Sequence, residues 1–133
     1  MSIREIFDTH PQPVGGDRDA LVRCIDECVA CAATCTSCAD ACLAEPDVQD
    51  MTRCIRLDLD CADLCEATRS IVTRQTARDD IVLRALVEAC LAACRACAEE
   101  CERHAEHHEH CRISARACRS CEQACTGLLG TLD

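Results

Sequence analysis

Seventeen cysteines dominate the sequence, and within four segments they recur at steps of three, four or seven residues. Such steps place side chains on one face of an α-helix, whereas a half-buried strand would need alternate residues. The segments are rich in Ala, Leu, Arg and Glu, which favour helices. The sequence therefore predicts an all-α protein in which four helices each direct a line of thiols towards a common axis. In chain order the four lines are Cys24, Cys28, Cys31, Cys35, Cys38 and Cys42; Cys54, Cys61 and Cys65; Cys90, Cys94, Cys97 and Cys101; and Cys111, Cys118, Cys121 and Cys125.

Proline and acidic residues mark where these helices begin and end. Asp17 is a suitable N-cap for the first helix, which should stop before Pro46. Asp47 and Asp79 are placed to open the second and third. The helices are predicted at about 17–45, 47–75, 79–107 and 109–130, after an N-terminal segment, 1–16, with a short helix and a loop. Because short connections make neighbouring helices antiparallel, residues 17–133 should form an up-down-up-down four-helix bundle.

The composition argues against several kinds of function and location. The net charge is −10, all fourteen basic residues are arginine, and Phe7 is the single aromatic residue. A nucleic-acid-binding protein needs a basic surface and stacking side chains, so neither DNA nor RNA is an expected partner. No apolar run is long enough to span a membrane. The N-terminus lacks a secretory or twin-arginine signal, so we expect a cytoplasmic protein whose thiols stay reduced.

Thiols in such numbers have three chemical explanations besides simple packing as small apolar residues. Disulfides within one helix are disfavoured, because Cβ atoms four residues apart are ~5–6 Å from each other and a disulfide prefers about 3.5–4.5 Å. The odd number of cysteines also prevents complete pairing. Catalysis by a thiol needs one or two activated cysteines rather than four full lines. Metal binding is therefore the favoured interpretation.

The charge of the interior indicates which metal. Zinc sites and iron–sulfur clusters take about four cysteines each, and zinc would leave uncompensated negative charge in the core. Cu(I) is soft and monovalent, so about one ion per thiolate neutralises the interior. Cu(I) also accepts two ligands, which one Cys-x-x-x-Cys pair can supply from a single helix. Seven such pairs occur: Cys24/Cys28, Cys31/Cys35, Cys38/Cys42, Cys61/Cys65, Cys90/Cys94, Cys97/Cys101 and Cys121/Cys125.

The cysteine lines resemble those of the copper storage proteins, a family of four-helix bundles that hold many Cu(I) ions on inward-facing cysteines. The resemblance covers residues 17–130, through the Cys-x-x-x-Cys-x-x-Cys-x-x-x-Cys runs of the first and third helices and the sparser lines of the other two. Without an export signal, the chain is similar to the cytosolic branch. The resemblance implies a homotetramer of bundles.

Four further residues continue the cysteine lines, and each has an ordinary alternative role. Met51 is a candidate ligand or core filler. Asp58, a carboxylate on a core face, could pair with an arginine, accept protons released by thiols, or bind copper. His104 and His108 continue the third helix beyond Cys101, and they could contact copper or form a solvated helix end. We expect all four residues to contribute to the metal site.

These residues make the two ends of the bundle different. The end reached by His104 and His108, which we call the mouth, should also gather Cys42, Met51, Cys54, Cys101 and Cys111. Aliphatic side chains should close the opposite end: Leu21, Val72, Leu83, Val87 and Leu128, with Leu129 beside them. Copper is therefore predicted to pass through the mouth.

The predicted function is cytosolic storage and detoxification of several Cu(I) ions, without catalysis. A copper metallochaperone is the nearest alternative, although it would bind one ion at an exposed pair of thiols. A thiol-based redox enzyme, a redox or metal sensor, and a zinc or cluster protein are further alternatives. The sequence gives no indication of the proteins that donate or accept the copper.

Overall fold

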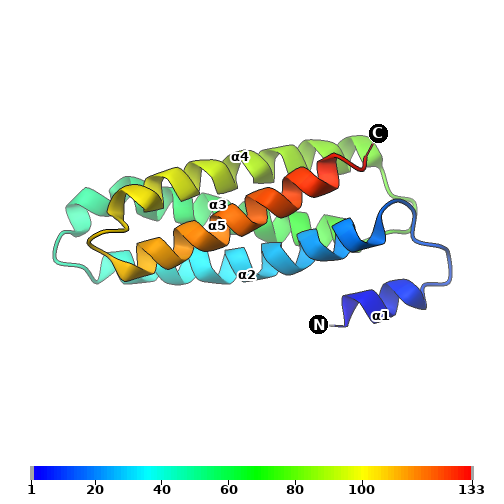
Figure 1. The fold of residues 1–133 in the computed structure, drawn as a ribbon, viewed down its shortest axis with the longest axis horizontal. Coiled ribbons are helices and arrows are strands. Elements are labelled where there is room, and N and C mark those ends of the chain that lie inside the picture. Colours follow the sequence, from blue (N-terminus) through cyan, green and yellow to red (C-terminus); the bar gives the residue numbers. More distant parts are fainter. Residues whose placement is uncertain (1, 133) are drawn as a thin grey trace.

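Residues 2–132 are described by a computed structural model, and helices account for all of the regular structure among them. The elements are α1 (Ile3–Asp8), α2 (Arg18–Leu43), the 3-10 helix η1 (Val48–Met51), α3 (Thr52–Thr73), α4 (Asp80–His104) and α5 (Glu109–Leu129). The four long helices, α2 to α5, lie side by side and alternate in direction (Figure 1). The predicted all-α bundle with a short N-terminal helix is confirmed.

The helix ends differ from the predicted ends by a few residues. Asp17 and Asp79 act as N-caps as expected, since their side chains accept hydrogen bonds from the backbone of Ala20 and of Ile81 and Val82. The predicted helix 47–75 is divided, because η1 forms a tighter turn before α3 begins. The helix predicted to reach residue 107 ends at His104, where His107 N and His108 N both donate to His104 O and the chain reverses.

Each long helix packs against two neighbours and directs its cysteines inward. α2 and α4 both contact α3 and α5, so the four helices surround one common interior. The turns from α2 to α3 and from α4 to α5 lie together at one end, and the α3–α4 connection lies at the other (Figure 1). The second end is filled as predicted by fully buried aliphatic side chains: Leu21, Val72, Leu83, Val87 and Leu128.

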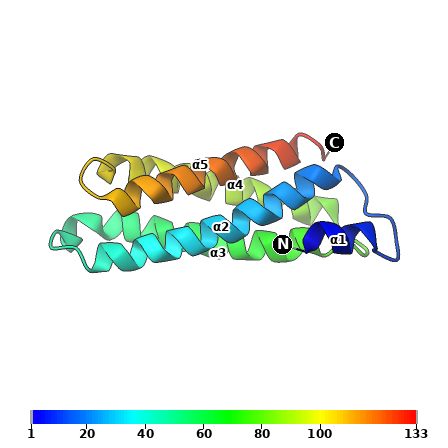
Figure 2. The same ribbon diagram turned by 60° about the horizontal axis from the view of Figure 1, so that its bottom comes forward.

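The short helix α1 folds back along the outside of the bundle beside the first half of α2 (Figures 1 and 2). Phe7 is its one buried residue, with 4% of its surface exposed. Arg4 pairs with Asp19 at 2.6 Å, and Arg18 pairs with Asp8. Because exposed ion pairs stabilise by at most ~1 kcal/mol each, burial of Phe7 is the main attachment of α1.

The outer faces of the long helices carry charged side chains, some of which join neighbouring helices. Arg119 on α5 donates to Glu102 on α4 through two nitrogens, at 3.0 and 2.9 Å. Arg95 on α4 donates to Glu122 on α5 at 2.8 Å. Within residues 2–132, no helix combines the length and the apolar character that crossing a membrane requires.

This packing predicts that the protein folds before it receives any metal. Neutral thiols are acceptable core residues, and the aliphatic end contributes an apolar core of its own. Far-UV circular dichroism of the reduced, metal-free protein should therefore show a highly helical spectrum and a cooperative thermal transition. A random-coil spectrum would mean that metal drives folding, as it does in zinc fingers.

Candidate metal centre

All seventeen cysteine side chains lie in the interior as free thiols, and none exposes more than 2% of its surface. The spacing of three and four residues explains this placement, because it keeps each line of thiols on the face that its helix presents to its neighbours. The interior is therefore lined with sulfur along most of the length of the bundle.

Thiols from different helices approach one another closely. The Sγ atoms of Cys35 and Cys118 are 3.4 Å apart, which joins α2 to α5. Those of Cys61 and Cys94 are 3.7 Å apart, which joins α3 to α4. Cys31–Cys35 at 3.7 Å and Cys97–Cys101 at 3.9 Å are contacts within one helix. The contacts across helices show that a metal site here can draw its ligands from several helices, rather than from one Cys-x-x-x-Cys pair.

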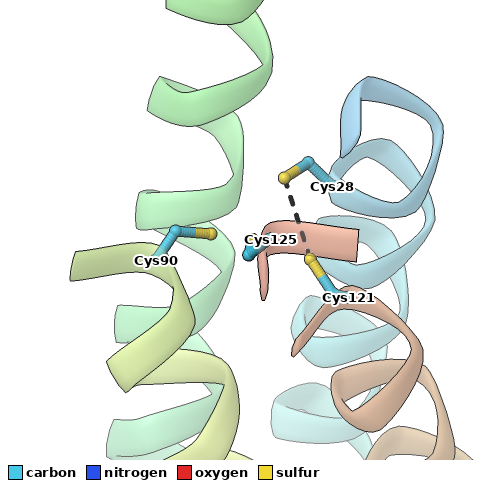
Figure 3. A group of neighbouring side chains, drawn as sticks. All are labelled: Cys28, Cys90, Cys121 and Cys125. Atoms are coloured by element: carbon cyan, nitrogen blue, oxygen red, sulfur yellow. Dashed lines mark hydrogen bonds between the residues drawn. The ribbon is translucent and has the colours of Figure 1, made fainter. Parts of the chain in front are cut away.

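The thiols form groups of four whose sulfur atoms could hold a metal ion. Figure 3 shows one group, in which Cys28 from α2 and Cys121 from α5 direct their sulfur atoms towards each other at 3.7 Å, with Cys90 from α4 facing them. Three of the groups form a series, because neighbours in it share Cys121 or Cys31, whereas the group of Cys38, Cys42, Cys54 and Cys111 shares no thiol with that series. The groups are Cys28, Cys90, Cys121 and Cys125; Cys31, Cys65, Cys94 and Cys121; Cys31, Cys35, Cys61 and Cys118; and Cys38, Cys42, Cys54 and Cys111.

Asp58 is fully buried among the thiols, as its place on the core face predicted. Its Oδ1 accepts hydrogen bonds from Cys97 Sγ at 3.2 Å and Ser114 Oγ at 3.1 Å. It also lies within one possible ligand group with Cys38, Cys54 and Cys101. Asp58 does not pair with an arginine, because its close partners are thiols and a hydroxyl. Accepting protons from thiols and binding copper are the two predicted roles that remain.

Burial determines the protonation of this region. Burial raises the pKa of Asp58 to about 7, against the opposing hydrogen bond from Cys97. Burial likewise raises the pKa of Cys42 to about 12. A neutral thiol at this position must lose its proton when it binds a metal ion.

The histidines near the mouth are held by carboxylates. His104 Nε2 lies 3.0 Å from Glu100 Oε2, on the same helix. His108 lies between two acidic residues: its Nδ1 is 2.7 Å from Glu45 Oε2 and its Nε2 is 3.0 Å from Asp47 Oδ2. The prediction that His108 continues the line of α4 is wrong, because α4 ends at His104 and His108 is the N-cap residue of α5. The ring centroids of His104 and His108 are 6.4 Å apart, so the turn still brings both to the mouth.

His110 is a histidine that sequence reasoning left out of the site. Its Nδ1 lies 3.4 Å from Cys38 Sγ and 3.6 Å from Cys111 Sγ, and its Nε2 lies 2.8 Å from Glu45 Oε2. Burial lowers the pKa of His110, but hydrogen bonds with Cys38 and Glu45 outweigh this effect and the pKa is raised. A sequence signal existed, because His110 precedes Ser114 by four residues and therefore lies on the same side of α5.

Met51 is fully buried at the end of η1, within the same core as the thiols. A thioether is a soft ligand, so Met51 remains a candidate ligand near the mouth. The structure thus brings together at this end Met51, His104, His108 and thiols such as Cys42 and Cys111, and it adds His110.

The donor set fits a soft, monovalent ion. The interior offers thiols almost exclusively, and each neutral thiol that gives up a proton to bind Cu(I) leaves the charge of the core unchanged. Divalent zinc on four thiolates would instead leave two negative charges at each site in a region without buried cations to compensate them among residues 2–132. The chemistry of the centre therefore favours Cu(I).

Comparisons with known proteins agree with this chemistry. A family model described as copper storage protein matches residues 17–130. The copper storage protein Ccsp from Streptomyces lividans, in a structure loaded with 10 copper equivalents, is 55% identical, with a TM-score of 0.95 over 96% of this chain and 98% of that chain. A second structure, of a cytosolic copper storage protein from Streptomyces lividans loading copper (five coppers), is 58% identical, with a TM-score of 0.84 over 85% of this chain and 94% of that chain.

A third similar structure is a Streptomyces lividans Ccsp variant in which one histidine is replaced by alanine. It is 57% identical, with a TM-score of 0.88 over 90% of this chain and 99% of that chain. A search of the curated proteins gave no match. With the family model matching nearly the whole bundle and relatives more than 50% identical along it, this chain belongs to the copper storage protein family.

Proposed function

We propose that this protein stores several Cu(I) ions in the cytosol as thiolate complexes, at about one ion per cysteine, and thereby protects the cell from free copper. The observation that carries the proposal is the number of buried groups of four thiols drawn from different helices, three of which are linked by sharing Cys31 or Cys121. The similar Streptomyces lividans proteins, described as cytosolic and as carrying five or ten coppers, support both the location and the capacity for several ions.

The burial of the thiols argues against the alternative functions. A metallochaperone needs an exposed ligand pair that a partner can reach, whereas all seventeen thiols here are at least 98% buried. A redox enzyme or a sensor needs an accessible thiol of raised reactivity. Storage is favoured because it needs many ligands shielded from other thiols and oxidants.

Titration with Cu(I) against a competing chelator tests the proposal directly. The reduced protein, kept free of oxygen, should saturate at about one Cu(I) per thiolate, because charge balance and low coordination numbers both favour that ratio. Saturation at one or two ions would support a chaperone. Tighter binding of about four Zn(II) ions per chain would support zinc storage instead.

The ligands in this proposal are all seventeen cysteines, with Met51, Asp58, His104 and His108 contributing near the mouth. Copper would bind first to imidazole, a weaker partner for Cu(I) than thiolate, and then pass to Cys101, Cys111, Cys42 and Cys54. The closed end is filled by fully buried aliphatic side chains such as Leu21 and Leu128, which offer copper no ligand atoms.

Replacing His104 and His108 together by phenylalanine tests this route. Copper uptake from a chelator should slow, while the saturating number of ions stays nearly unchanged, because the thiols that store copper remain. The matched control is Leu128→Ile at the closed end, which should alter neither quantity. If the histidine variant loads at the wild-type rate, or the closed end proves to control the rate, the mouth is assigned to the wrong end.

We also propose that the chain assembles into a homotetramer, as the resemblance to the family implies. Several large apolar side chains are exposed on the outer faces of the helices, among them Leu59 on α3 and Ile81 and Val82 at the start of α4. Assembly would remove some of this apolar surface from water. The molar mass in solution, measured by light scattering, tests the proposal.

A further inference from the structure

Glu45, in the turn between α2 and η1, contacts two histidines with a single carboxylate oxygen. Its Oε2 lies 2.7 Å from Nδ1 of His108 and 2.8 Å from Nε2 of His110. The two rings are close together, with centroids 5.5 Å apart. Glu45 therefore links the outer histidine of the mouth to the one that contacts the thiols.

The two nitrogens of His110 face different surroundings. Nε2 faces Glu45, while Nδ1 faces the sulfur atoms of Cys38 and Cys111 at 3.4 and 3.6 Å. A neutral imidazole carries one proton, and the nitrogen without it has the lone pair that can bind a metal. An ionised carboxylate only accepts hydrogen bonds, so the contact with Glu45 favours the proton on Nε2 and leaves the lone pair of Nδ1 directed at the thiols.

We propose that Glu45 is a positioning residue of the mouth, which holds His110 as the Nε2–H tautomer so that Nδ1 can bind Cu(I) beside Cys38 and Cys111. The proposal rests on the storage function and deepens it. Glu45 lies outside the thiol groups and would orient one of the copper ligands, His110. A carboxylate behind a histidine ligand fixes the ring and raises its basicity, and removing such a partner commonly weakens metal binding by about 10–100-fold.

The same oxygen gives Glu45 a second effect, on the relative placement of the rings. Glu45 contacts Nδ1 of His108, and Asp47 lies 3.0 Å from Nε2 of the same ring. The His108 ring is therefore held by two carboxylates, and the His110 ring shares one of them. Loss of Glu45 should therefore free both rings at once, whereas loss of Asp47 should affect His108 alone.

The tautomer can be measured without copper, by long-range proton–nitrogen NMR correlation of the reduced protein labelled with ¹⁵N in histidine. Comparison with a His110→Asn spectrum identifies the His110 signals among the five histidines. In the wild type and in Glu45→Gln, His110 should carry its proton on Nε2, because the glutamine carbonyl oxygen can still accept a hydrogen bond from Nε2–H. Glu45→Ala should show a mixture of tautomers or the proton on Nδ1.

Glu109→Ala is the matched control. This substitution also removes one carboxylate near the mouth, but Glu109 is exposed and paired with Arg112. It should leave the His110 signals unchanged. Far-UV circular dichroism confirms that each variant is folded. A wild type with the proton on Nδ1, or a folded Glu45→Ala variant that keeps it wholly on Nε2, would overturn the proposal.

Copper binding supplies a second readout. The affinity for the first Cu(I) ions, measured against a chelator, should fall by about 10–100-fold in Glu45→Ala and recover most of its value in Glu45→Gln. The saturating number of ions should stay the same in both variants. An equal loss of affinity in Glu109→Ala would contradict a specific role for Glu45, whereas saturation of the wild type at one or two ions would contradict the storage function and leave the tautomer result standing.

Discussion

Replacing Cys31, Cys35, Cys61 and Cys118 together by alanine should lower the saturating number of Cu(I) ions by about four. These thiols form one complete group of possible ligands from α2, α3 and α5, and they lie between the mouth and the closed end. If each thiolate contributes one ion, the loss should equal the number of thiols removed. Titration of the reduced variant against a competing chelator gives the number directly.

The same variant should also load its remaining inner sites slowly. Cys31 belongs to two neighbouring groups, so its removal interrupts the series along which ions could pass towards Cys90 and Cys125. Single replacements of two buried hydroxyl residues on the same lines, Thr68→Ala and Ser114→Ala, serve as controls that should keep the full capacity. A folded cysteine variant that retained the wild-type capacity would show that copper is not bound ion for thiolate.

The second large effect concerns Asp58 and the pH dependence of stability. Burial raises its pKa in the folded protein to about 7, from an ordinary value of 3.8 in the unfolded chain. Between these two values the folded state holds a proton that the unfolded state has lost, so the free energy of unfolding falls as the pH rises. The slope from this one group approaches ~1.4 kcal/mol per pH unit and ends above about pH 7.

Asp58→Asn should remove that slope, because the amide does not titrate. We expect the variant to gain stability relative to the wild type as the pH rises from about 4 to about 7, by about 3–4 kcal/mol in total. Urea unfolding of the reduced, copper-free proteins across this range measures the difference. Asp60→Asn, an exposed change on the same helix, is the control, and an identical pH dependence in wild type and Asp58→Asn would contradict the prediction.

The sequence was sufficient to predict the bundle because one pattern carried most of the information. Cysteines at helical spacing define both the helices and their inner faces, and buried residues such as Leu21 and Leu128 continue those faces to the closed end. Asp58 was predictable for the same reason, since helical periodicity places any residue on the line in the core.

The turns at the mouth were less predictable, because periodicity ends where a helix ends. His108 was placed on α4 by counting residues, but the chain reverses after His104 and no Gly or Pro marks that point. The role of His110 depends on Glu45 and Cys38, which are more than 60 residues away in sequence and meet it only in the folded chain. Contacts between distant segments of this kind cannot be read from local spacing.

The burial of every cysteine has a consequence for how the rest of the cell meets this protein. Each Cu(I) that replaces a thiol proton leaves the total charge as it was, and the ions lie behind helices whose outer residues need not move. The empty and the filled forms would then share one isoelectric point and one outer electrostatic field. A partner protein that binds only one of the two forms would have to contact the mouth, because the charge of the remaining surface does not change with the amount of copper bound.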